Sequence, residues 1–152
     1  MFDDMTTVVD ALPLATGARL RAGETFIPRE LHTLAGGTVR VPDPRKLVHL
    51  QMRRYAGCPI CSLHLRSFVR RKDDLGRAGV REVAVFHSSA EELRKVHTDL
   101  PFDVVPDPRR TLYAAFGCTT SPLKYGKHAD DQWSIDELLS LVQAARAPQV
   151  RP

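Results

Sequence analysis

A pair of cysteines, Cys58 and Cys61, constrains this chain more than any other feature. Residues 47–52, just before the pair, are mostly apolar, which predicts a buried strand. Pro59 suits the first turn of a helix, because the N–H that proline lacks has no partner there in any helix. Two thiols three residues apart, at a junction of strand and helix, are the arrangement of a dithiol redox site.

Strand and helix patterns alternate along the rest of the chain, which predicts an α/β layered fold with parallel strand pairing. The expected strands are 31–34 and 38–41, forming a hairpin around 35–37, then 47–52 (interrupted only by His49 and Gln51), 82–86 and 102–105. The expected helices are 59–75, one capped by Ser88 or Ser89 with Glu91 or Glu92, one starting at Asp107, and one capped by Ser134 with Glu137.

Length and composition predict a single globular domain. The chain has 152 residues, of which 43% are hydrophobic and 26% charged, enough to bury a core. We expect a loose lead-in over 1–22, one domain over 23–146 and a flexible tail over 147–152.

Several classes of partner and location are not expected. No apolar run is long enough to cross a bilayer, and the acidic N-terminus lacks the layout of a secretory signal, which predicts a cytoplasmic protein. The net charge is +4, but the basic residues are not interleaved with aromatic ones as in a nucleic-acid groove. Three cysteines are too few, and odd in number, for a disulfide-stapled secreted domain.

The two cysteines are expected to have different roles in the redox reaction. Only a thiolate attacks disulfides and peroxides, and Cys58 precedes a helix whose free N–H groups favour negative charge. Arg53 and Arg54 arrive on the same strand end and would lower the pKa of Cys58 further if they point toward it. Cys61 lies on the apolar face of the helix and is expected to be the less exposed thiol. Cys58 would therefore attack, and Cys61 would close the disulfide.

Other roles for these residues stay open. Cys58, Cys61 and His64 share a spacing that allows three ligands to face one metal ion, although a closed zinc site needs a fourth. The two cysteines are alternatively plain core residues. Cys118 is expected to be a small buried residue, a second resolving thiol or an intermolecular one. The redox hypothesis requires no bound cofactor.

The chain resembles the peroxiredoxin-like proteins of the alkyl hydroperoxide reductase/thiol-specific antioxidant (redoxin) superfamily. The resemblance lies in residues 54–61, 83–89, 106–108, 112–117 and 125–134. It implies a thioredoxin-like three-layer sandwich with an N-terminal β-hairpin, and makes 23–146 a redoxin domain. It also implies that Cys58 attacks and Cys61 is the second cysteine. The supporting residues would be Arg53, Arg54, Tyr55, Gly57 and Pro59.

The implied activity is that of a thiol–disulfide oxidoreductase or thiol-dependent antioxidant. Its substrate would be a small peroxide or a protein disulfide, and its reductant a thiol protein such as a thioredoxin.

Two departures from the family pattern qualify this expectation. True peroxiredoxins place Thr or Ser three residues before the attacking cysteine and Pro seven before, where this chain has Tyr55 and Gln51. The stretch over 118–124 is also short, which predicts that one core strand is lacking. A sheet edge left open in this way would be covered by a second copy, in a homodimer, or by the N-terminal segment. A non-catalytic interaction protein on a redoxin scaffold is therefore a further alternative.

Overall fold

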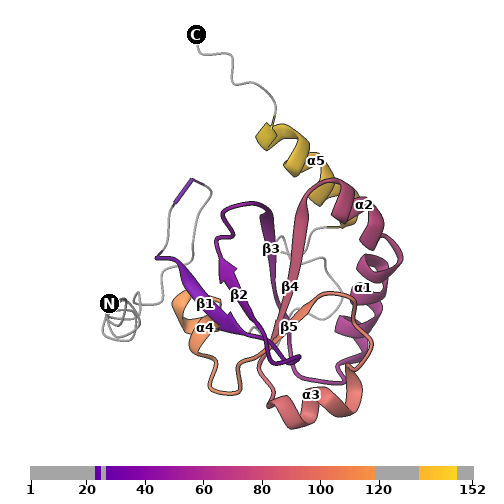
Figure 1. The fold of residues 1–152 in the computed structure, drawn as a ribbon. Helices are drawn as coiled ribbons and strands as arrows, with labels where there is room; N and C mark the ends of the chain where they lie inside the picture. The colour runs from indigo at the N-terminus through magenta and orange to yellow at the C-terminus, as the bar shows by residue number, and fades with distance from the viewer. Residues whose placement is uncertain (1–22, 25–26, 119–133, 147–152) are drawn as a thin grey trace.

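The computed structural model describes residues 23–24, 27–118 and 134–146 and arranges them as an α/β fold (Figure 1). The expected lead-in over 1–22, the tail over 147–152 and most of the shortened stretch after Cys118 lie outside the described residues. The domain limits, the missing core strand and the covering of its edge therefore remain predictions.

A three-stranded parallel sheet forms the middle layer. Its strands are β3 (Leu47–Met52), β4 (Val80–Phe86) and β5 (Asp103–Pro106), in the order β3-β4-β5. The central strand β4 is buried on both faces, as the nearly continuous apolar run over 82–86 predicts. Because the pairing is parallel, β3 and β4 end at the same edge of the sheet.

The N-terminal hairpin covers one face of this sheet. Strands β1 (Arg29–His32) and β2 (Thr38–Val41) pair antiparallel, which confirms the expected hairpin. The first strand ends at His32 rather than at residue 34, because Thr33 begins the turn and its Oγ1 accepts the Gly37 N–H at 3.1 Å. The apolar side chains of the hairpin pack with those of the sheet: Leu31, Val39, Val41, Val83, Val85 and Val105.

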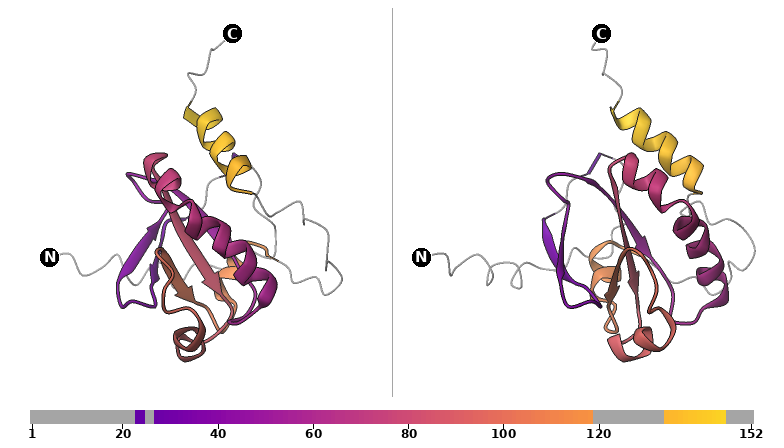
Figure 2. Two further views of the ribbon diagram at one scale, coloured as in Figure 1. Left: turned by 90° about the vertical axis from the view of Figure 1, so that its right-hand side faces the viewer. Right: turned by 45° about the vertical axis from the view of Figure 1, so that its right-hand side comes forward.

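Helices cover the opposite face. Figure 2 shows α1 (Pro59–Arg70), α2 (Lys72–Arg77) and α5 (Ile135–Arg146) following one another along that side. Their core residues form one cluster with the sheet: Phe68, Leu75, Val80, Ile135, Leu138 and Val142. The short helix α4 (Thr111–Ala115) instead places Tyr113 in the cluster of the hairpin. The result is three layers. None of the described helices is long and apolar enough to cross a membrane.

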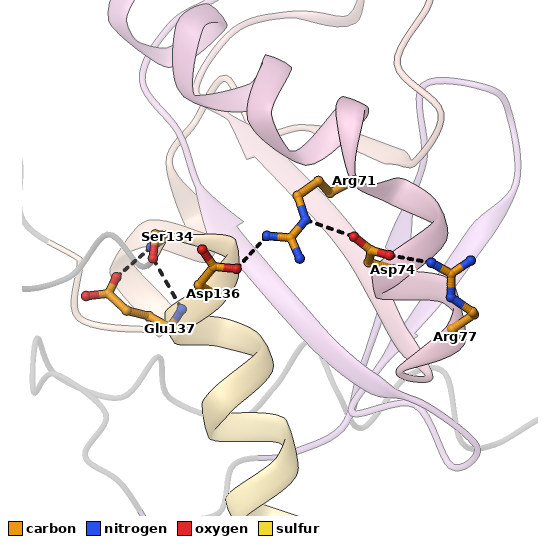
Figure 3. Close-up of polar contacts among 6 residues, drawn as sticks. All are labelled: Arg71, Asp74, Arg77, Ser134, Asp136 and Glu137. Carbon is orange, nitrogen blue, oxygen red and sulfur yellow. Dashed lines mark hydrogen bonds and ion pairs between the residues drawn. The ribbon is translucent and has the colours of Figure 1, made fainter.

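The helix expected over 59–75 is interrupted at Arg71, so that expectation was wrong. Arg71 leaves helical geometry at φ −115° and ψ 25°. Its guanidinium contacts Asp74 in α2 at 2.8 Å and Asp136 in α5 at 2.5 Å, and Asp74 also pairs with Arg77 (Figure 3). The spacing of the apolar residues gives no sign of this break, because the helices on both sides of it pack into the same core cluster.

The helix caps largely follow the sequence. Ser89 and Glu92 form a reciprocal capping box at the start of α3 (Ala90–Val96), and Ser134 with Glu137 caps α5 (Figure 3). Helix α4 begins at Thr111 rather than near Asp107. The Asp107 carboxylate instead accepts the N–H groups of Thr111 and Leu112, at 2.9 and 2.8 Å.

Candidate functional site

The loop between β3 and α1 carries the cysteine pair and is tied to the end of β4. The Arg53 N–H donates to the Val85 carbonyl at 2.7 Å, continuing the pairing beyond β3. The Ala56 N–H donates to Ser88 Oγ at 2.9 Å. Sequence reasoning assigned Ser88 only a possible capping role. Its position directly after a buried strand was the available signal that it would lie beside this loop.

Gly57 gives the loop its shape. Its φ of +78° lies in the left-handed region, which other residues adopt only with strain. A Cβ placed there would stand 3.9 Å from Val96 in α3, an ordinary contact. Backbone conformation, rather than lack of space, therefore requires glycine. Cys58 then caps the N-terminus of α1 with Pro59 in the first turn, as the sequence predicts.

Both thiols are buried. Cys58 is 1% exposed and Cys61 is 5% exposed, so the expectation that Cys61 would be the less exposed of the two was wrong. The reason is that the chain folds back before the helix. The Cys58 N–H bonds to the Tyr55 carbonyl at 3.3 Å, and α1 starts at the next residue. An attacking role for Cys58 therefore requires the loop to admit its substrate.

The pKa of the Cys58 thiol is lowered from its ordinary value. Burial by itself raises this pKa. Hydrogen bonds from the backbone N–H and the thiol of Cys61 and from the Ile60 N–H outweigh that cost, with help from the charge of Arg54. The start of a helix thus stabilises the thiolate by its unpaired N–H groups, the effect expected at this position.

The pKa of the Cys61 thiol is raised. Burial is the largest cause, and the neighbouring Cys58 adds to it. A hydrogen bond with the Arg54 backbone and the charge of Arg53 oppose the shift without cancelling it. The pair therefore consists of one thiol whose pKa lies below its ordinary value and one whose pKa lies above it.

Removing the Cys61 thiol should make Cys58 less acidic. In a Cys118→Ser background, we expect Cys61→Ala to raise the Cys58 pKa by roughly one unit, because the thiolate loses a hydrogen-bond donor. The pH dependence of alkylation by iodoacetamide measures the change. Cys61→Ser, which restores a donor, should shift the pKa less than Cys61→Ala does. Equal shifts in the two variants would contradict the assigned hydrogen bond.

Arg53 and Tyr113 close the inner side of the site. Arg53 is 4% exposed, and burial lowers the pKa of its guanidinium while Cys61 and Glu82 raise it. The Tyr113 hydroxyl donates to the backbone carbonyl of Arg53 and to that of Val85, at 2.9 Å for the latter. Burial raises the pKa of Tyr113, so the phenol remains a donor. This contact was not predicted, because Tyr113 and Arg53 are far apart in the sequence.

Arg54, Tyr55 and His87 form the outer rim. The Arg54 guanidinium lies 5.6 Å from the centre of the Tyr55 ring, and the Tyr55 and His87 rings are 6.3 Å apart. Tyr55 is 45% exposed, so its phenol borders solvent. Burial lowers the pKa of His87, and the charges of Arg110 and Arg54 lower it further. His87 was not predicted, since its spacing from any nucleophile is uninformative.

The alternative of a metal site gains no support from the geometry. Among the described residues, no three His, Cys, Asp or Glu side chains are placed to hold a metal ion. His64 instead packs edge-on against Phe68, with ring centres 5.1 Å apart. Cys118 is partly buried and packs beside the hairpin cluster.

Comparison with known proteins gives one family match. The sequence profile described as AhpC/TSA antioxidant enzyme matches residues 67–146. This stretch is more than half of the chain, and it begins after the cysteine pair. No curated protein matches the chain in sequence.

Solved structures with a similar fold include peroxiredoxins. AhpC of Mycobacterium tuberculosis has a TM-score of 0.65 at 17% identity, over 88% of this chain and 97% of that one. A yeast mitochondrial 1-Cys peroxiredoxin has a TM-score of 0.55 at 15% identity, over 61% of this chain and 48% of that one. A mutant of peroxiredoxin 6 from Arenicola marina has a TM-score of 0.55 at 18% identity, over 71% of this chain and 54% of that one. The chain thus spans about half the length of the last two. These likenesses show the thioredoxin-like fold of peroxiredoxins.

Proposed function

Because the chain belongs to the AhpC/TSA antioxidant enzyme family, we propose that it is a thiol–disulfide oxidoreductase of peroxiredoxin-like type that works through Cys58 and Cys61. The observation that carries this proposal is the placement of Cys58 at the N-terminus of α1, with Cys61 buried in the first turn of the same helix. The family match does not include either cysteine, so their roles are argued from this geometry.

The proposed reaction has two steps in the protein. The Cys58 thiolate attacks one oxygen of a hydroperoxide, the O–O bond breaks, and the departing alkoxide takes up a proton, leaving Cys58 as a sulfenic acid. Cys61 then attacks the Cys58 sulfur, the S–O bond breaks, and water leaves with the proton that Cys61 gives up. With a protein disulfide as substrate, the Cys58 thiolate attacks one sulfur, the substrate S–S bond breaks and the other substrate sulfur leaves as a thiolate that takes up a proton. Cys61, after losing its proton, then attacks Cys58, which forms the Cys58–Cys61 disulfide and releases the second substrate thiol.

A dithiol protein such as a thioredoxin is the proposed reductant. It would reduce the Cys58–Cys61 disulfide and become oxidised itself. The structural study of the yeast peroxiredoxin similarly describes thiol resolution via glutathione and thioredoxin systems. Arg53, Arg54, Tyr55, Gly57 and Pro59 are proposed as supporting residues. A homodimer that covers the edge of the sheet remains a prediction for the part of the chain outside the described residues.

Oxidation of the purified protein tests the proposal. Mild peroxide treatment should remove two thiols and two hydrogens from the wild type by forming a Cys58–Cys61 disulfide, seen as a lower thiol titre and mass. Cys58→Ser and Cys61→Ser should not form it, and Cys61→Ser should retain a sulfenic acid on Cys58. A wild type that forms no such disulfide would show that the redox proposal is wrong.

Two observations favour a second candidate function. Both thiols are buried, and Tyr55 stands where peroxiredoxins carry a small hydroxyl residue. A non-catalytic interaction protein on the same scaffold would fold normally but would not turn over peroxide or insulin disulfides with any dithiol reductant. The turnover of peroxide and of insulin disulfides by the wild type, measured with a dithiol reductant, separates the two candidates.

A further inference from the structure

A row of polar side chains runs through the layer between the sheet and α1, where apolar residues are expected. His49, Gln51 and Arg53 are alternate residues on and just after β3, so they point to the same face of the sheet. The His49 ring stacks on Phe68 of α1, with ring centres 5.4 Å apart. Gln51 is 5% exposed and Arg53 4%. The row is therefore buried along its length.

Glu82 on β4 joins this row. Its Oε2 accepts hydrogen bonds from His49 Nδ1 at 2.8 Å and from Gln51 Nε2 at 2.5 Å. The Gln51 Oε1 in turn accepts a hydrogen bond from the Arg53 guanidinium. An amide suits this position because it donates to a carboxylate at one end and accepts from a guanidinium at the other. The four residues form a connected path from Glu82 to Arg53.

Two atoms of the path lack hydrogen-bond partners among the described residues: Arg53 Nε and Glu82 Oε1. Buried polar atoms without partners destabilise a fold, and an apolar row would pack at lower cost. The polar side chains of this row therefore add little to the stability of the fold. The charge of Arg53 does, however, interact with both Cys61 and Cys58.

We propose that Glu82 and Gln51 are positioning residues that hold the Arg53 guanidinium in the buried layer between the sheet and α1, where Cys61 is also buried, so that its charge stabilises the thiolate of Cys61. The carboxylate of Glu82 also limits the positive charge that the cysteines experience. This inference rests on the proposed function, because the resolving step requires Cys61 to lose its proton. It adds Glu82, Gln51 and His49 to the residues that act on that step.

The other groups around the row are few. The Tyr113 hydroxyl of α4 donates to backbone carbonyls, those of Arg53 and Val85, and His64 of α1 contacts Phe68 on the helix side. Arg54 influences Cys58 directly from the rim. Asp107, just before α4, acts electrostatically on Tyr113 and His87. Glu82 is the acidic residue that is hydrogen-bonded into the row and acts on Arg53, so its removal has a definite expected sign.

The test measures the Cys61 pKa in Cys58→Ser/Cys118→Ser protein, where Cys61 is the only thiol. Labelling the cysteine Cβ with ¹³C and following its chemical shift against pH reports ionisation at a buried site. Arg53→Met should raise the pKa by roughly one unit, because a nearby positive charge is lost. Glu82→Gln should lower it by a smaller amount, because a carboxylate is removed and the hydrogen bond from Gln51 can be kept.

Two further variants separate electrostatics from packing. Gln51→Met breaks the path without changing charge, and should shift the pKa in the direction of Arg53→Met but less. Arg53→Lys keeps the positive charge, so the pKa of Cys61 should stay near its value in the parent protein. This variant can also be measured if Arg53→Met fails to fold. Loss of packing alone would expose Cys61 and lower its pKa in all the variants. A Glu82→Gln shift that is absent or upward would overturn the proposal.

These measurements need no oxidant, substrate or reductant. Opposite shifts in Arg53→Met and Glu82→Gln would support the electrostatic role even if the wild type formed no disulfide on oxidation. Disulfide formation accompanied by shifts of equal sign would leave the proposed function standing and refute the role of the row. The two proposals can therefore fail independently.

Discussion

Replacing Cys58 with serine is expected to lower dithiol-dependent turnover of a hydroperoxide or of insulin disulfides by at least about 1,000-fold. A serine hydroxyl at this site keeps the hydrogen-bonding geometry at the start of α1 but does not ionise near neutral pH. It therefore cannot replace the thiolate as nucleophile. Steady-state rates with a thioredoxin as reductant, at matched protein concentrations, measure the loss.

The other cysteines provide matched controls. Cys118→Ser should retain most of the activity, because Cys118 packs beside the hairpin cluster. Cys61→Ser should trap a mixed disulfide between Cys58 and the substrate or reductant, visible on a non-reducing gel. Residual turnover of more than one tenth in Cys58→Ser would mean that another group attacks the substrate. No turnover in the wild type would favour the non-catalytic candidate.

Replacing Phe68 with alanine is expected to lower the free energy of unfolding by about 3–5 kcal/mol. Phe68 is 0% exposed and belongs to the cluster that joins α1 and α2 to α5 and the sheet. Its ring also contacts His49 and His64, so truncation opens a cavity beside the buried polar row. Urea unfolding followed by circular dichroism measures the change.

Leu63→Ala is the matched control for this prediction. Leu63 lies in the same helix, five residues earlier, but is 72% exposed. Its truncation should change the free energy of unfolding by no more than about 0.5 kcal/mol. Similar losses for Leu63→Ala and Phe68→Ala would contradict the packing of α1 against the sheet.

Local sequence signals predicted the elements of the fold well. The hairpin, the strand before the cysteines, the capping box at Ser89 and the cap at Ser134 are each specified by residues within a few positions of one another. The break at Arg71 was not predictable in the same way. At the break Arg71 pairs with Asp136 of α5, which is distant in the sequence and adjacent only after α5 packs onto the core.

For the candidate site too, the features set by local structure could be predicted from the sequence, and those set by tertiary contacts could not. The positions of Cys58, Gly57 and Pro59 relative to α1 follow from the motif itself, because a helix start is a local structure. The burial of Cys58 does not follow from the motif, because this burial depends on how the loop is bound to the end of β4 through Ser88.

The α/β class, the position of the dithiol between strand and helix, and the family of the chain follow from the order of the residues alone. The groups that surround the thiols become known only from the folded structure. His49, Gln51 and Arg53 appear in the sequence as interruptions of an apolar strand, and Glu82 as a lone acid on another. Parallel pairing of β3 with β4 places His49 beside Glu82 and so connects the four side chains. Electrostatic interactions act through space, and the distances between these charges exist only once the sheet has formed.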